Sequence, residues 1–130
     1  MGVRYLLDSH AFYWLTAVPE RVDERTRAAL LTPGAEIHVS AVSAFEFATK
    51  QRLGKFDSAI VDRWDEAVRA LLAQHLAVST THAIRAGALD WSHRDPFDRL
   101  LAAQAITEGL VLVTADPAFD SAPGLSLLRW

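Results

Sequence analysis

Short apolar runs alternate with longer segments of helical periodicity along this chain. The first run covers residues 3–7 and is rich in residues that favour β-strands. The run at residues 110–114 is hydrophobic at nearly every position, which is typical of a strand buried on both faces. Short strands are predicted at residues 3–7, 37–39, 76–78, 110–114 and 125–128.

Segments with apolar residues at three- and four-residue spacing lie between these runs and predict helices. The clearest covers residues 58–74, where Ile60, Trp64 and Val68 share one face. Asp95 and Pro96 have the pattern of a helix cap followed by the first helical position. The predicted helices cover residues 11–15, 19–31, 41–52, 58–74, 80–87 and 96–108.

Strands separated by helices imply a mainly parallel central sheet that is covered by helices on both faces. The predicted fold class is therefore α/β. The 130 residues are the usual size of one domain, so we expect a single domain over residues 1–130. Ligands of such sheets bind at the carboxyl ends of the strands, which is where candidate chemistry should be sought.

Composition narrows the possible functions. The chain has no cysteine, which excludes disulfides, cysteine-based metal sites and thiol catalysis and favours a reducing compartment. We find neither an apolar signal core near the N-terminus nor a long uncharged apolar stretch, so we expect a cytoplasmic protein without a membrane partner. The net charge of −3 argues against a general polyanion-binding surface. A nucleic-acid substrate would therefore require local arginines or a bound cation.

Four acidic residues, far apart in the sequence, are predicted to meet at one edge of the sheet. Asp8 directly follows the first strand, and Asp116 follows closely after the run at residues 110–114. Glu46 lies in the first turns of the helix after the second strand. Asp98 lies in the first turn of the helix that Asp95 begins. Asp8 and Asp116 thus lie at the carboxyl ends of strands, and Glu46 and Asp98 lie at helix starts that could face the same crevice.

Each of these acids also has an ordinary structural explanation when it is taken alone. Glu46 completes a possible capping box with Ser43, and Asp98 stands where a helix dipole favours an acid. Asp8 and Asp116 are common types of turn or cap residue. Their convergence is the stronger argument, because four neighbouring carboxylates repel one another unless a cation lies between them.

A hard divalent cation, Mg²⁺ or Mn²⁺, suits carboxylate ligands and leaves coordination positions for water and phosphate. Such an ion lowers the pKa of a bound water and offsets the charge of a phosphodiester under attack. Ser9 and Thr114 lie near the same strand ends, and Arg94 and Arg99 flank Asp98. We expect these four residues to contact substrate, with His93 the one histidine placed near the site.

Four motifs in order then resemble those of PIN-domain ribonucleases, especially the VapC-type toxins of VapBC toxin–antitoxin pairs. The motifs are residues 6–11 (LLDSHA), 40–48 (SAVSAFEFA), 93–105 (HRDPFDRLLAAQA) and 112–116 (LVTAD). The resemblance spans nearly the whole chain. It implies a PIN-like fold and Mg²⁺- or Mn²⁺-dependent endoribonuclease activity on RNA. It also implies a homodimer and a cognate antitoxin protein.

Carried over by position, the family's acidic metal site falls on the acids selected above, Asp8, Glu46, Asp98 and Asp116. The family's hydroxyl residue near the last acid matches Thr114. Two choices stay open at this point. Asp95 could join or replace Asp98, although the run after Asp98 is the one that follows the family's third acid. Asp120 could likewise supplement or replace Asp116.

Two other functions are compatible with parts of the pattern. A phosphoacceptor signalling domain also gathers acids and Mg²⁺ at strand ends, but it needs a second acid after the first strand and a late lysine, and neither is present. A catalytically silent binding module would not need all four acids. Aromatic residues such as Trp14 and Trp64 exceed what a small core requires, so we expect some of them in a partner surface.

Overall fold

Five parallel strands form the centre of the molecule in the computed structural model, which describes residues 2–56 and 59–130. The strands are β1 (Arg4–Leu7), β2 (Glu36–Ser40), β3 (Gln74–Leu76), β4 (Val111–Thr114) and β5 (Leu127–Arg129). Their order across the sheet is β3-β2-β1-β4-β5, and every neighbouring pair is parallel. The mainly parallel α/β fold predicted from the sequence is confirmed.

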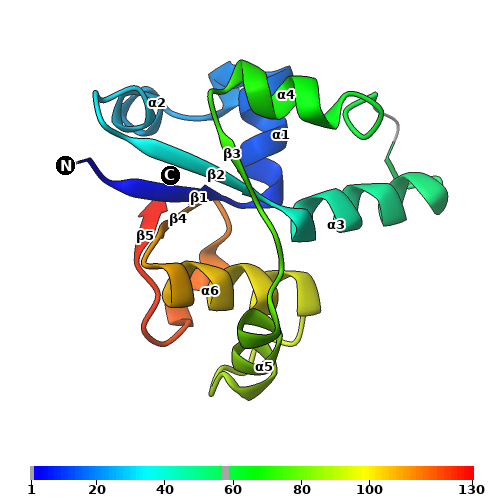
Figure 1. Cartoon of the computed structure of the whole chain (residues 1–130), viewed down its shortest axis with the longest axis vertical. Coiled ribbons are helices and arrows are strands. Elements are labelled where there is room, and N and C mark those ends of the chain that lie inside the picture. The colour runs from blue at the N-terminus through cyan, green and yellow to red at the C-terminus, as the bar shows by residue number, and fades with distance from the viewer. Residues whose placement is uncertain (1, 57–58) are drawn as a thin grey trace.

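Helices cover both faces of this sheet (Figure 1). One face carries α1 (Ser9–Ala17), α2 (Glu24–Leu30) and α4 (Trp64–Ala70). The other face carries α6 (Pro96–Glu108), and α5 (Thr80–Ala88) packs against α6 on the side away from the sheet. The remaining helix, α3 (Ala41–Arg52), extends outward from the carboxyl end of β2. Within the described residues, no helix combines the length and apolar character needed to cross a membrane.

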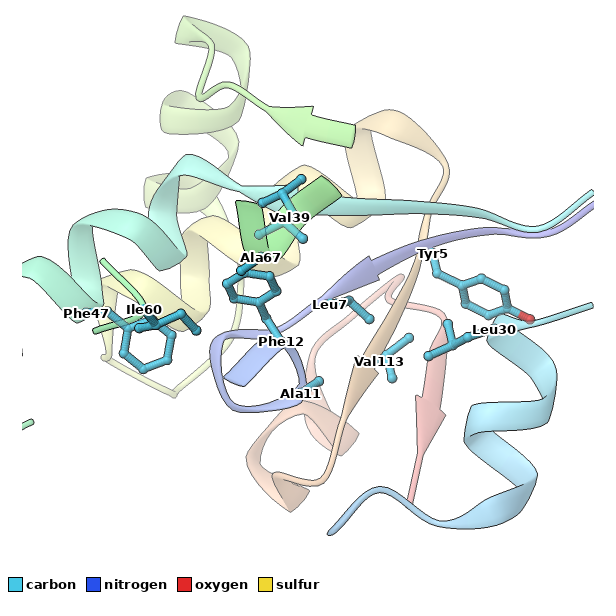
Figure 2. Packing of buried hydrophobic residues seen from close by; sticks show 11 residues of the cluster. Tyr5, Leu7, Ala11, Phe12, Leu30, Val39, Phe47, Ile60, Ala67 and Val113 are labelled. Carbon is cyan, nitrogen blue, oxygen red and sulfur yellow. The ribbon is translucent and has the colours of Figure 1, made fainter. Parts of the chain in front are cut away.

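Alternate residues of the central strand β1 pack into two different cores. Tyr5 and Leu7 of β1 belong to the cluster beneath α1 and α4, which Figure 2 shows, whereas Leu6 belongs to the cluster beneath α6. Burial on both faces explains why the strand patterns are continuous rather than alternating. Trp64, one of the aromatic residues considered for a partner surface, is half-buried and packs on the buried Phe12 with ring centroids 4.7 Å apart. A partner surface that includes Trp64 stays a prediction.

The helix predicted over residues 58–74 is much shorter in the structure. Residues 57–58 lie outside the described part of the chain, residues 59–63 form turns, and α4 covers only Trp64–Ala70. Ile60 is nevertheless buried in the core. The three- and four-residue spacing of apolar residues therefore indicated correctly that Ile60 is buried, but not that it lies in a helix. The chain then reverses at Leu72, whose φ of 53° lies in the left-handed region, and β3 begins at Gln74, two residues earlier than predicted.

Other element boundaries also differ from the prediction. The segment after Pro19 is divided into a single 3₁₀ turn (Pro19–Arg21) and α2, because the Asp23 carboxylate accepts a hydrogen bond from Thr26 N at 2.8 Å and starts a new helix. The last strand lies at Leu127–Arg129 rather than at residues 125–128. By contrast, α3 covers the predicted residues 41–52 and α6 the predicted residues 96–108.

Candidate metal centre at the carboxyl edge of the sheet

The register of the central strands brings three polar residues to one edge. Leu7 pairs with Val39 on one side and with Val113 on the other. Asp8 follows Leu7, Ser40 follows Val39, and Thr114 follows Val113. Asp8 N donates to the Val113 carbonyl at 3.0 Å, which extends the ladder by one step past β1. Asp8, Ser40 and Thr114 therefore follow directly after the last residues at which β1 pairs with β2 and β4, as the sequence predicted for the first of them.

Asp8 is almost completely buried, with 5% of its surface exposed. Its Oδ1 accepts from Ala11 N at 2.7 Å and so caps α1, and its Oδ2 accepts from Thr114 Oγ1 at 2.5 Å. The pKa of Asp8 is raised to about 6, chiefly by burial and also by the charges of Asp116 and Glu46, although the hydrogen bond from Thr114 opposes the rise. A carboxylate held in this way lacks a compensating positive charge.

Glu46 enters the same edge from α3. That helix begins after Ser40, whose hydroxyl accepts from Val42 N, so Glu46 lies beyond the first turn and forms no capping box. Its Oε1 accepts from Ser9 Oγ at 2.7 Å, and its Oε2 lies 2.8 Å from Lys50 Nζ. Only 8% of its surface is exposed. Glu46 therefore does not cap its helix, which was the structural explanation that the sequence offered for an acid at this position.

Asp98 lies in the first turn of α6, and its partner is His93. The Asp98 Oδ2 atom lies 2.7 Å from His93 Nε2. The pKa of Asp98 is raised to about 6, chiefly by burial and also by the charges of Asp95 and Asp116, while the contact with His93 opposes the rise. Asp95 caps α6 through Oδ1, which accepts from Phe97 N at 2.9 Å. Possible ligand atoms of His93, Asp95 and Asp98 lie within 4.8 Å of one another.

Asp116 connects the two halves of the site electrostatically. It is exposed, caps the 3₁₀ turn Pro117–Ser121 through Oδ1, and donates its N–H to Thr114 Oγ1 at 3.0 Å. Its charge raises the pKa of both Asp8 and Asp98. Asp120, the alternative left open by the sequence, instead forms an ion pair with Arg129 at 2.9 Å. The geometry favours Asp116.

The four residues expected to contact substrate differ in the contacts that they make in the structure. The Ser9 and Thr114 hydroxyls donate to Glu46 and Asp8, so they orient these acids. Arg99 donates to four backbone carbonyls, those of Ala86, Leu89, Trp91 and His93, at 2.6–2.9 Å. Four of its five N–H donors are thereby used in holding the α5–α6 connection, which corrects its assignment as a phosphate contact. Arg94 is exposed beside His93.

Positive charge at this edge comes from Lys50, next to Glu46, and from His93 when it is protonated. Across the described residues, the only triad of possible ligands within 4.8 Å is the one around Asp98, so the four predicted acids are spread more widely than that. Asp8 and Glu46 are buried, and Asp8 forms no ion pair with any described residue. Carboxylate oxygens are the donor type that a hard divalent cation prefers. The residues present therefore fit such an ion.

Residues 5–125 match the family model of the PIN domain. This protein belongs to the PIN-domain family. The PIN domain is 37% identical over 116 residues to Ribonuclease VapC22 of Mycobacterium tuberculosis, and the match covers 85% of each chain. The resemblance to VapC-type PIN domains seen in the sequence motifs is confirmed.

Solved structures share the fold of this PIN domain. The VapBC2 complex of Rickettsia felis, bound to a DNA fragment from its promoter, contains a chain with a TM-score of 0.72 and 20% identity, covering 98% of this chain and 99% of that one. The DNA-bound VapBC complex of Salmonella typhimurium has the same TM-score and identity, with 98% of both chains covered. VapBC-5 of Mycobacterium tuberculosis follows with a TM-score of 0.62, 19% identity and coverage of 98% and 99%. These matches support the α/β fold.

Proposed function

We propose that this PIN domain is a metal-dependent endoribonuclease and the toxin of a VapBC-type toxin–antitoxin pair. The observation that carries the proposal is the buried, under-compensated acidic edge of a chain that is 37% identical to a ribonuclease. A silent binding module would have no use for two carboxyl groups whose pKa is raised to about 6, because buried charge of one sign lowers the stability of the fold.

The ion that fits best is Mg²⁺ or Mn²⁺. The side chains that would hold it are those of Asp8, Glu46, Asp98 and Asp116. When bound, the ion supplies an activated water and offsets the charge of the phosphodiester. These assignments rest on the carboxylate chemistry and on the shared electrostatic environment of the four acids.

The surrounding side chains keep the acids in place. Thr114 orients the Asp8 carboxylate, Ser9 and Lys50 orient Glu46, and His93 orients Asp98. Neighbours that fix the ligands in this way are a general feature of metal sites. Arg94, which is exposed and next to His93 in the chain, would supply a contact to an RNA phosphate.

The partners follow from the same family. We propose a cognate antitoxin, because the structural neighbours include several toxin–antitoxin complexes. We further propose a homodimer, and we place the reaction in the cytoplasm, where RNA and a co-produced antitoxin are both present. The RNA substrate is supported by the ribonuclease name of the relative.

Expression in a bacterial host tests the toxin assignment. We expect the wild-type chain alone to arrest growth and degrade specific RNAs. Co-expression of the proposed antitoxin, which in this family is usually the product of a small adjacent gene, should restore growth. The matched control is Asp98→Asn, which should be harmless at equal expression. If wild-type protein leaves growth and bulk RNA unchanged in several hosts, the toxin assignment is wrong and the silent module takes its place.

A further inference from the structure

A groove between α1 and the end of α3 combines aromatic and basic side chains beside the candidate metal centre. Its volume is about 280 Å³. The aromatic lining includes Tyr13, Trp14 and Phe56, and the basic lining consists of His10, Lys50 and Lys55. Nothing in the proposed cleavage mechanism uses the aromatic side chains or Lys55.

The aromatic wall of the groove is fixed by the core. Phe56 stacks on the buried Phe47, with ring centroids 4.8 Å apart and an interplanar angle of 26°. Tyr13 meets Phe56 edge-on at 5.1 Å and Trp14 at 5.2 Å. The Arg21 guanidinium lies 4.5 Å from the centroid of the Trp14 ring. A wall ordered in this way loses little entropy when it binds a flat ligand.

The charge of the groove points to an anion. The chain has a net charge of −3, yet its two lysines, Lys50 and Lys55, both line this groove. Lys55 is exposed, and no carboxylate among the described residues pairs with it. Lys50 pairs with Glu46 at 2.8 Å, so the groove lies next to the metal centre.

We infer that this groove binds one nucleotide of a single-stranded RNA next to the scissile phosphate. The base stacks on the aromatic wall, and the phosphate lies near Lys50 and Lys55. Aromatic side chains beside basic ones are the usual means of binding single strands with little sequence readout. The volume is near the lower limit for small-molecule pockets, which suits a single nucleotide. The inference rests on the proposed ribonuclease function.

The aromatic wall is tested by RNA binding without cleavage. In an Asp98→Asn background, a fluorescein-labelled 12-nucleotide RNA of mixed sequence is titrated and its anisotropy followed. Trp14→Leu keeps the apolar bulk and removes the aromatic face, so we expect about tenfold weaker binding, as for the loss of one stacked base. Trp14→Phe retains an aromatic face and should stay within about threefold of the parent.

The basic side is tested by salt dependence. Lys55→Gln should reduce the slope of log K against log salt by about 0.7, the value for one phosphate contact on a single strand. Arg85→Gln removes an equally exposed charge on α5, away from the groove, and should leave the slope unchanged. Because Lys55 is exposed, its replacement tests the groove even if Trp14→Leu fails to fold.

Three outcomes are distinguishable. If wild-type protein cleaves RNA but Trp14→Leu and Lys55→Gln bind it like the parent, the groove inference is overturned and the ribonuclease function stands. If these variants bind RNA normally but lose the complex with the adjacent gene's product, the groove docks a protein and the inference is equally overturned. If wild-type protein cleaves no RNA with any divalent ion, the proposed function fails, and the groove inference falls with it.

Discussion

The two carboxylate oxygens of Asp8 have different partners. Its Oδ1 accepts from Ala11 N and caps α1, whereas its Oδ2 accepts from Thr114 Oγ1. From the sequence, a cap and a metal ligand look like competing explanations for such a residue. The structure shows that they are compatible, because a carboxylate can accept a backbone hydrogen bond and still present a second oxygen.

Replacing single acids tests the residue-scale account. Asp8→Asn and Asp98→Asn should each abolish cleavage, because each removes a metal ligand. Each should also leave the thermal midpoint of the metal-free protein unchanged or higher, because each removes a charge that burial disfavours. For Asp8 this penalty is about 3 kcal/mol. Cleavage and thermal midpoint are measured on the same preparations. Near wild-type cleavage by either variant would remove that acid from the site.

The raised pKa values also predict how stability depends on pH. Asp8 and Asp98 have a pKa of about 6 in the folded state against 3.8 in the unfolded chain. Folding therefore favours their protonated forms, and the stability that they contribute is fully present below pH 3.8 and lost as pH rises through 6. In EDTA, urea unfolding should show wild-type protein losing more stability between pH 4.5 and 7 than the Asp8→Asn, Asp98→Asn double variant. Equal losses in the two proteins would contradict these pKa assignments.

At the scale of elements, sequence reasoning placed the acids better than it placed the helices. The position of Asp8 and Asp116 follows from a general property of parallel sheets, whose strands all end at one edge. The prediction of one helix over residues 58–74 was wrong because Ile60 lies in a turn and is still buried. Apolar periodicity cannot distinguish a turn from a helix when both bury their side chains.

Other features had no local signal in the sequence. The role of Arg99 depends on the path of the α5–α6 connection, since its partners are backbone carbonyls rather than particular side chains. The aromatic and basic groove joins α1 to the end of α3, and only the fold brings Trp14 near Lys55. The position of His93 in the sequence, beside Arg94 and Asp95, predicted that it lies near the site. Its contact with Asp98 is visible only in the structure.

The carbonyl-binding role of Arg99 has a direct consequence for stability. Arg99→Gln should lower the free energy of unfolding by about 2–3 kcal/mol, because the carbonyls of the α5–α6 connection lose a charged donor. Arg94→Gln, an exposed neighbour, should change it by less than about 0.5 kcal/mol. Urea denaturation followed by circular dichroism measures both. Equal stability of the two variants would show that Arg99 does not hold this connection.

At the scale of the whole molecule, metal binding should appear as stabilisation. A ligand that binds only the folded state adds about 2.7 kcal/mol at one hundred times its dissociation constant. Mn²⁺ or Mg²⁺ should therefore raise the thermal midpoint of wild-type protein. The Asp8→Asn, Glu46→Gln double variant should lose most of this increase. An unchanged response in the double variant would place the ion elsewhere on the molecule.

Cleavage of total RNA by the purified protein tests the central claim most directly. The protein is incubated with RNA in Mn²⁺, in EDTA, and in EDTA followed by excess Mn²⁺, and the new RNA ends are mapped by sequencing, with Asp98→Asn purified in parallel. We predict discrete new ends that appear with the metal, vanish in EDTA, return when the metal is restored and are absent with Asp98→Asn. The same ends in EDTA or with Asp98→Asn, or no new ends under any condition, would contradict a metal-dependent ribonuclease built on these acids.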